Sequence, residues 1–81
     1  MPKNLLFPPE AVSDVSRIIL TGEDRLLIER HKGLFSYDSQ CIRLRIGRKI
    51  LSILGEQLVI HRFGTDEICI RGTIRSLEFE S

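Results

Sequence analysis

The chain has 81 residues, of which 42% are hydrophobic and 28% are charged, and its twelve basic and eleven acidic residues nearly cancel. This composition argues against a disordered chain, and the length fits one domain rather than two. A near-neutral charge creates no global field that would attract nucleic acid or an anionic membrane, so any electrostatic site must be local. Eleven Ile against one Ala favour strands, because Ala is the preferred filler of helices and β-branched residues suit a pleated sheet.

Cysteine usage and hydropathy bear on the compartment. Two cysteines are too few for a disulfide scaffold, and no run approaches the roughly 20 apolar residues of a membrane span. The N-terminus has no charged region, apolar run and cleavage site of the kind that marks a signal peptide. We therefore expect a cytoplasmic protein with reduced thiols.

Residues 1–16 differ from the rest and are interpreted as an N-terminal arm. A short apolar patch at residues 5–7 is followed by two prolines, and residues 10–16 form at most a short helical turn. We expect the arm to dock on the remaining domain through its apolar side chains, namely Leu6, Phe7, Val12 and Val15. Disorder of the first few residues is the alternative.

From residue 17 onward, six glycines at positions 22, 33, 47, 55, 64 and 72 separate short β-branched runs. Turn signals at this spacing are typical of an all-β sandwich, barrel or roll. We predict strands at about 17–21, 25–31, 34–38, 41–46, 50–54 and 58–63, followed by a final pair or one bent strand over 68–79. The tips of two hairpins are expected at residues 47–49 and 63–66.

Within these runs, apolar residues alternate with polar ones, which predicts antiparallel strands with one buried face and one wetter face. The inward positions are Leu26, Ile28, Ile42, Leu44, Ile46, Leu58, Ile60, Ile68 and Ile70. Residues 50–54 are apolar on both faces, which indicates a central strand or one that the arm covers. Gly72 lies where the alternation changes parity, which suggests a bulge or sharp bend.

The predicted fold is a single all-β domain over residues 17–81, a small rolled antiparallel sheet or open barrel of about six to seven short strands. A short β-solenoid is the alternative, because Leu-x-Ile segments recur after polar turns. The recurrence has no constant period, which weakens that alternative.

Metal binding and catalysis are poorly supported by the sequence. A zinc site is conceivable from four residues on the outward parity: His31, Cys41, His61 and Cys69. Their spacing contains no close ligand pair, so we expect no metal or other cofactor. Phosphate-binding glycine loops are absent, and neither cysteine precedes a helix that would activate its thiol. We therefore expect a protein that is not an enzyme and has no small-molecule substrate.

A cluster of positive charge lies within residues 43–49. It consists of Arg43, Arg45, Arg48 and Lys49. These side chains could bind phosphates of nucleic acid or an anionic lipid surface, although the aromatic residues that stack on single strands are missing from the run. The alternative is a solvated strand face that pairs with Glu29, Glu56 or Asp38.

Two apolar side chains, Val59 and Phe63, fall on the wetter parity. Exposed apolar groups of this kind are candidates for a partner surface. Both could equally be core residues under a rolled sheet, and the sequence leaves the two interpretations open.

Several segments together resemble the YabP/YqfC family of sporulation proteins, and the YqfC branch in particular. The resemblance covers about residues 10–80. It includes Ser16-Arg17-Ile18-Ile19-Leu20-Thr21-Gly22, Leu26-Leu27-Ile28-Glu29-Arg30-His31-Lys32-Gly33-Leu34, Tyr37-Asp38, Ile42-Arg43-Leu44-Arg45, Gly55-Glu56-x-Leu58-x-Ile60 and Glu67-Ile68-x-Ile70-x-Gly72-x-Ile74-x-Ser76-Leu77-x-Phe79. Three departures stand out: Ser16 replaces a usual proline, Arg30 replaces a usual Asn, and residues 48–54 replace a usual Gly-x-Leu hairpin turn.

The resemblance implies a non-enzymatic protein of the mother cell of an endospore-forming bacterium, acting as a binding or assembly module. It also implies a membrane-anchored partner of the YqfD type, through which the chain would lie at the membrane periphery. Self-association is a further expectation, and nucleic acid is not the expected partner. Glu29, His31 and Gly33 match the family's most recognisable turn. A structural role suits them, with Gly33 supplying a positive φ and Glu29 or His31 hydrogen-bonding the bend.

Overall fold

The computed structural model describes residues 15–80, whose regular structure is six β-strands. They are β2 (Arg17–Thr21), β3 (Arg25–Glu29), β4 (Leu34–Tyr37), β5 (Cys41–Ile46), β6 (Lys49–Phe63) and β7 (Glu67–Glu80). All neighbours pair antiparallel in one sheet of order β2-β3-β7-β6-β5-β4. The predicted antiparallel all-β fold is confirmed, and the β-solenoid alternative is wrong. The predicted arm lies almost entirely outside the described residues.

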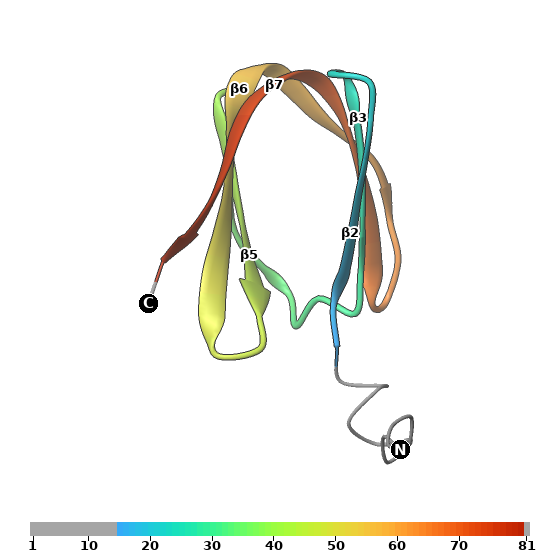
Figure 1. Ribbon diagram of the computed structural model, residues 1–81, viewed down its shortest axis with the longest axis vertical. Helices are drawn as coiled ribbons and strands as arrows, with labels where there is room; N and C mark the ends of the chain where they lie inside the picture. Colours follow the sequence, from blue (N-terminus) through green and yellow to red (C-terminus); the bar gives the residue numbers. More distant parts are fainter. Residues whose placement is uncertain (1–14, 81) are drawn as a thin grey trace, which may run out of the picture.

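The two longest strands, β6 and β7, give the sheet its shape. They run side by side, arch over one end of the molecule and form part of both walls of the fold (Figure 1). One layer contains β2, β3, the first half of β7 and the second half of β6. The other contains the remaining halves of β6 and β7 with β5 and β4. The sheet therefore folds onto itself but stays open, since β2 and β4 end its order.

The arch depends on two glycines, Gly55 on β6 and Gly72 on β7, each of which lies close to the backbone of the other strand. A Cβ on Gly55 would lie 2.0 Å from the carbonyl oxygen of Thr73, and one on Gly72 would lie 2.5 Å from that of Gln57. Gly72 has φ +133° and Gln57 has φ 54°, conformations that favour glycine and disfavour most side chains. The bend expected at Gly72 is confirmed. The strands predicted at 50–54 and 58–63 are instead one strand, because Gly55 bends the chain without reversing it.

Loops from both layers fix the arch in place. The amides of Gly72 and Ile74 donate to carbonyls of the β2–β3 turn at distances of 3.2 and 3.0 Å. On the other side, the amides of Gly55 and Leu58 donate to carbonyls of the β4–β5 turn at 3.0 and 2.8 Å. Backbone amides close to the bulges, where the strand ladder is irregular, are thereby paired.

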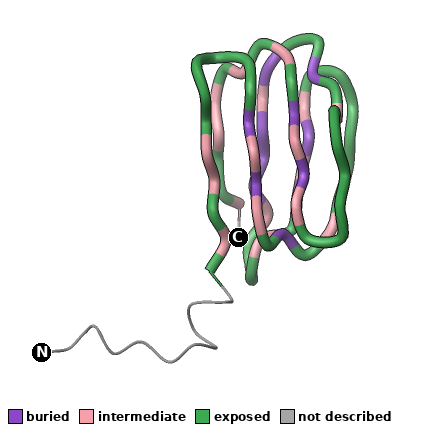
Figure 2. The backbone as a smooth tube through the Cα atoms, turned by 90° about the vertical axis from the view of Figure 1, so that its right-hand side faces the viewer, coloured by how far each residue is buried: buried purple, intermediate pink, exposed green. Residues whose placement is uncertain are grey.

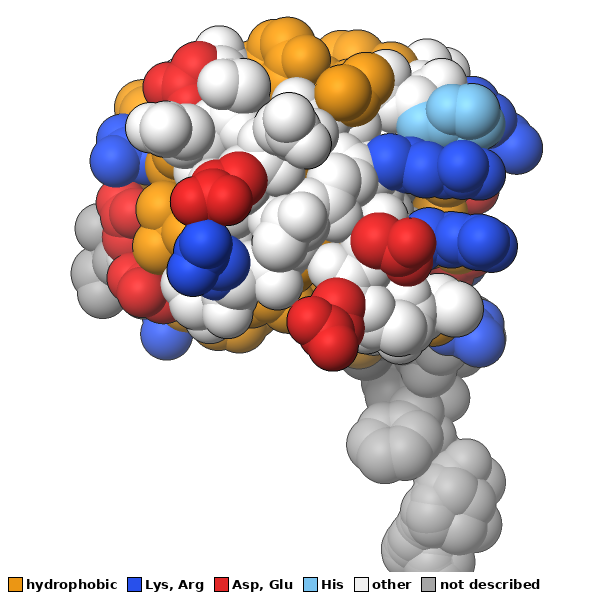
Figure 3. All heavy atoms as spheres, turned by 90° about the horizontal axis from the view of Figure 1, so that it is seen from above, with side chains coloured by type: hydrophobic (Ala, Val, Ile, Leu, Met, Phe, Trp, Pro, Cys, Tyr) orange, Lys and Arg blue, Asp and Glu red, His pale blue; other side chains and the backbone are white. Residues whose placement is uncertain are grey.

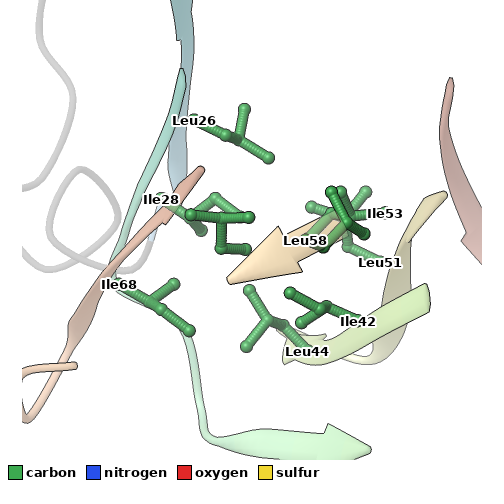
Figure 4. Packing of buried hydrophobic residues seen from close by; sticks show 9 residues of the cluster. Leu26, Ile28, Ile42, Leu44, Leu51, Ile53, Leu58 and Ile68 are labelled. Carbon is green, nitrogen blue, oxygen red and sulfur yellow. The ribbon is translucent and has the colours of Figure 1, made fainter. Parts of the chain in front are cut away.

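The core lies between the two layers, where apolar side chains from both walls meet (Figure 4). Buried positions alternate along the strands, as Figure 2 shows. Nine apolar residues are at most 2% exposed: Leu26, Ile28, Ile42, Leu44, Leu51, Ile53, Leu58, Ile68 and Ile70. Seven of the nine inward positions expected from alternation are among them, and the other two, Ile46 and Ile60, pack against the cluster.

The doubly apolar stretch at residues 50–54 lies in the centre of its layer, between β5 and β7. Leu51 and Ile53 face the core, whereas Ser52 is on the outer face and is still only 2% exposed. The Ser52 hydroxyl donates to the Glu80 carboxylate. The predicted central position of this stretch is therefore confirmed, and its outer-face apolar residues, Ile50 and Leu54, are partly buried.

Candidate functional site

The family-like turn forms the crossover between the two layers. Residues 30–33 leave β3 in one wall and reach β4 in the other, at the end opposite the arch (Figure 1). The amides of Arg30 and His31 donate to the Asp66 carbonyl at 2.5 and 3.1 Å, and the Lys32 amide donates to the Arg45 carbonyl at 2.7 Å. The crossover thus connects the β6–β7 hairpin of one layer to β5 of the other.

Two of the three predicted turn residues have the expected structural role. Gly33 has φ +129°, and His31 is 5% exposed with its Nδ1 accepting from the Gly33 amide at 3.0 Å. Glu29 does not hydrogen-bond the bend but lies 3.9 Å from Arg17 on β2. Arg30 has φ 64°, a left-handed conformation in which Asn is enriched, so the departure from the family's Asn places a disfavoured residue there.

The basic cluster of residues 43–49 is divided between two places. Arg43 and Arg45 lie on the outer face of β5, while Arg48 and Lys49 are at the exposed β5–β6 turn. The Arg43 Nε atom is 3.8 Å from the Glu80 carboxylate. Arg45 lies over the Phe35 ring at 5.9 Å, a distance suited to a cation–π contact. Two of the four cations therefore have intramolecular partners.

The prediction that Glu29, Glu56 or Asp38 pairs with this cluster is wrong. Glu56 forms an ion pair with Arg75 at 2.8 Å, and the Asp38 carboxylate accepts from the amides of Gln40 and Cys41. Glu80 takes their place because antiparallel pairing brings the end of β7 next to the start of β6 and, beyond it, to Arg43. Nothing local in the sequence indicates that neighbour.

Val59 and Phe63 are both exposed, at 53% and 54%, but they lie on opposite faces. Val59 pairs with Arg71 on the outer face, whereas Phe63 pairs with Ile68, a core residue. The bulge between Ile60 and Arg62 changes the parity. The Phe63 ring lies 5.6 Å from the His31 ring. Val59 and Phe63 therefore do not form one partner surface.

The four Cys and His residues are also dispersed. Cys41 is on the outer face of one layer, His61 and Cys69 are on the other, and His31 is buried in the crossover. Within residues 15–80, no three or more His, Cys, Asp or Glu side chains group as metal ligands would.

The edge strand β4 has an exposed apolar surface that sequence reasoning missed. Leu34, Phe35 and Tyr37 are 37%, 52% and 49% exposed, and β4 forms one end of the sheet. The sequence signal for this surface is a run without charge or proline at residues 34–37. That the run lies at the edge of the sheet follows only from the strand order.

A second missed feature is on the outer face of the opposite layer. Arg25 and Arg71 are directly opposite each other on β3 and β7, and both line a shallow pocket that His61 and Thr21 also border. Figure 3 shows Lys and Arg side chains and a histidine gathered on this side of the molecule. Arg25 and Arg71 are far apart in the sequence, so only the strand pairing brings them together.

No helix within residues 15–80 is long and apolar enough to span a membrane.

Comparison with known proteins gives consistent matches. The YabP family model matches residues 13–81. The Bacillus subtilis protein YqfC, which is described as uncharacterized, is 31% identical over 74 residues, or 91% of this chain and 80% of the relative. No solved structure shows a significant match. The family match spans every strand that the structure describes.

Proposed function

Since the chain belongs to the YabP family, a sporulation-associated family, we propose that it acts as a binding module in spore development and not as a catalyst. The module captures an extended segment of a partner protein along the edge of β4. Its place of action is the mother-cell cytoplasm, and a membrane-anchored partner of the YqfD type would hold it at the membrane periphery.

The observation that supports this proposal is the composition of the β4 edge. Natural proteins protect edge strands with charged side chains, prolines, bulges or covering loops. β4 has one bulge, between Leu34 and Ser36, but no charge and no proline, and all four of its residues are exposed. An extended peptide added to such an edge gains main-chain hydrogen bonds and places alternate side chains against the exposed apolar groups.

The length of β4 favours a different protein over a second copy of this chain. Stable interfaces bury about 800 Å² on each partner, and two four-residue strands pairing with each other supply too little contact. A partner segment can instead continue beyond β4 and lie against the outer face near Arg45 and Phe35, which already contact each other.

The experiment is a pull-down of a YqfD-type protein with the purified chain and with matched edge variants. The double variant Phe35→Glu, Tyr37→Lys keeps the net charge and adds one charge of each sign to the edge. Glu at position 35 would face Arg45, so folding is retained, and circular dichroism checks it. We expect this variant to lose at least tenfold in partner affinity.

The control is Leu20→Lys, because Leu20 is 47% exposed on the opposite edge strand and the substitution adds a charge there. It should bind as the parent does. Equal loss in both variants, or no capture by the parent chain, would overturn the assignment to β4. Analytical ultracentrifugation of the parent supplies the remaining test, since a stable dimer that the β4 variant dissociates would replace the partner by a second copy.

A further inference from the structure

The polar residues that line the pocket on the outer face of the β2-β3-β7-β6 layer are all hydrogen-bond donors. The volume of the pocket is about 190 Å³, and four polar residues, Thr21, Arg25, His61 and Arg71, line it together with the apolar Leu26, Leu27, Cys69 and Ile70. No carboxylate among residues 15–80 lines the pocket. We refer to it as the Arg25/Arg71 pocket.

Strand register explains how the donors converge. Thr21 on β2 is opposite Arg25 on β3, and Arg25 is opposite Arg71 on β7. These three side chains therefore form one row across the outer face. His61 reaches the same pocket from β6, at the bulge that separates Ile60 from Arg62.

Within residues 15–80, Arg71 lacks the acidic neighbour that the other arginines on this face have. Arg17 lies 3.9 Å from Glu29, and Arg62 lies 3.2 Å from Glu67. Arg25 lies 4.0 Å from the exposed carboxylate of Asp24, its sequence neighbour, whereas Arg71 forms no ion pair in the part of the chain that the structure describes. Like charges directly opposite each other in a sheet are destabilising. The placement of Arg25 opposite Arg71 is therefore not explained by the stability of the free domain.

We propose that the Arg25/Arg71 pocket binds a phosphate group. Two guanidinium groups present planar donors that suit phosphate oxygens, and the Thr21 hydroxyl and His61 imidazole add two more donors. The volume is below the roughly 300 Å³ of sites that enclose a complete small molecule. The pocket therefore holds the phosphate and leaves the rest of its ligand outside. This site is on the layer opposite β4 and is independent of the proposed partner edge.

Two sources supply that chemistry, a soluble phosphate ester and a phospholipid headgroup, and two experiments distinguish them. In the first, ¹⁵N-labelled protein is titrated with inorganic phosphate and with glycerol phosphate at constant ionic strength. We expect saturable amide shifts centred on residues 21, 25, 61, 69 and 71. In the second, the protein is floated with vesicles of phosphatidylcholine alone or with added phosphatidic acid, and binding only to the latter assigns the phosphate to a lipid.

The variants are Arg25→Gln and Arg71→Gln, with Arg17→Gln as the matched control. Arg17→Gln removes the same charge from the same face but from outside the pocket. Each pocket variant should weaken phosphate or vesicle binding at least tenfold, and Arg17→Gln should change it less than twofold. Because each pocket variant also removes a like-charge contact, its melting temperature should equal or exceed that of the parent.

The outcomes separate a binding role from a structural one. A lower melting temperature in both pocket variants would show that the arginines stabilise the fold and would overturn the proposal. Absence of binding in both experiments, or binding that Arg17→Gln weakens as much as Arg71→Gln, would also overturn it. Loss of the β4 partner interaction would leave these results unchanged, so the two proposals fail separately.

Discussion

The arch between the two layers makes Gly55 the most demanding position in the chain. Replacing Gly55 by Ala places the new Cβ 2.0 Å from the Thr73 carbonyl oxygen, 3.0 Å from the Thr73 carbonyl carbon and 3.1 Å from a Leu58 methyl. The oxygen belongs to the backbone of β7, so no side-chain rotation relieves the contact. The two strands must separate by more than an ångström where the bend is tightest.

The cost follows from general values for overpacking. Inserting a methyl group into a well-packed site costs about 1–3 kcal/mol and occasionally more, and a backbone obstacle puts Gly55→Ala at about 3 kcal/mol or above. For a domain of this size, 1 kcal/mol shifts the melting temperature by about 4–8 °C. We therefore expect thermal denaturation, followed by circular dichroism, to show a decrease of about 12 °C or more.

Gly64→Ala is the matched control for this substitution. A Cβ at position 64 would lie 3.4 and 3.5 Å from atoms of Glu67, which is close to ordinary van der Waals contact, and Gly64 has no positive φ. Its melting temperature should stay within about 4–8 °C of the parent, equivalent to about 1 kcal/mol. If Gly55→Ala melts as Gly64→Ala does, the arch relaxes without cost and the steric argument for the fold is wrong.

Two further predictions concern the crossover at residues 30–33. Arg30→Asn should raise the free energy of unfolding by about 0.5–1 kcal/mol, because residue 30 has φ 64° and Asn tolerates left-handed backbone better than Arg. Urea denaturation measures this gain. A decrease in the free energy of unfolding would contradict the conformational argument. His31→Leu should lower the free energy of unfolding by about 1–3 kcal/mol, because it leaves the Gly33 amide without its acceptor. His31→Asn offers a side-chain oxygen and should recover part of that loss in the same assay. Equal losses in the two variants would show that the hydrogen bond contributes nothing to stability.

The faces of the sheet could be predicted from sequence because alternation is a local property. Leu26 with Ile28, and Ile68 with Ile70, are assigned to the core by their spacing alone, and all four are buried. Phe63 is exposed, but alternation assigns it to the wrong face, because a bulge between Ile60 and Arg62 changes the parity. A bulge depends on which residues the partner strand presents, and that information is not local.

The difference between a turn and a bend is equally non-local. Gly47 and Gly55 are both glycines between β-branched runs, yet Gly47 reverses the chain and Gly55 only bends it. Gly55 is required because β7 passes so close to it, and β7 lies later in the sequence. The Arg25/Arg71 pocket was missed for the same reason, since its two arginines meet only through the β3–β7 register.

The two proposed contacts are on opposite layers, and this arrangement makes their relationship testable. Substitutions more than about 7–10 Å apart that share no partners are usually additive within about 0.3–0.5 kcal/mol. Combining Arg71→Gln with the Phe35→Glu, Tyr37→Lys pair should therefore produce the sum of the separate losses, and the chain should hold its partner and a phosphate ligand at once. Competition between the partner and phosphate-bearing vesicles, measured by flotation with both present, would show that one surface serves both ligands. The assignment of the contacts to two layers would then be wrong.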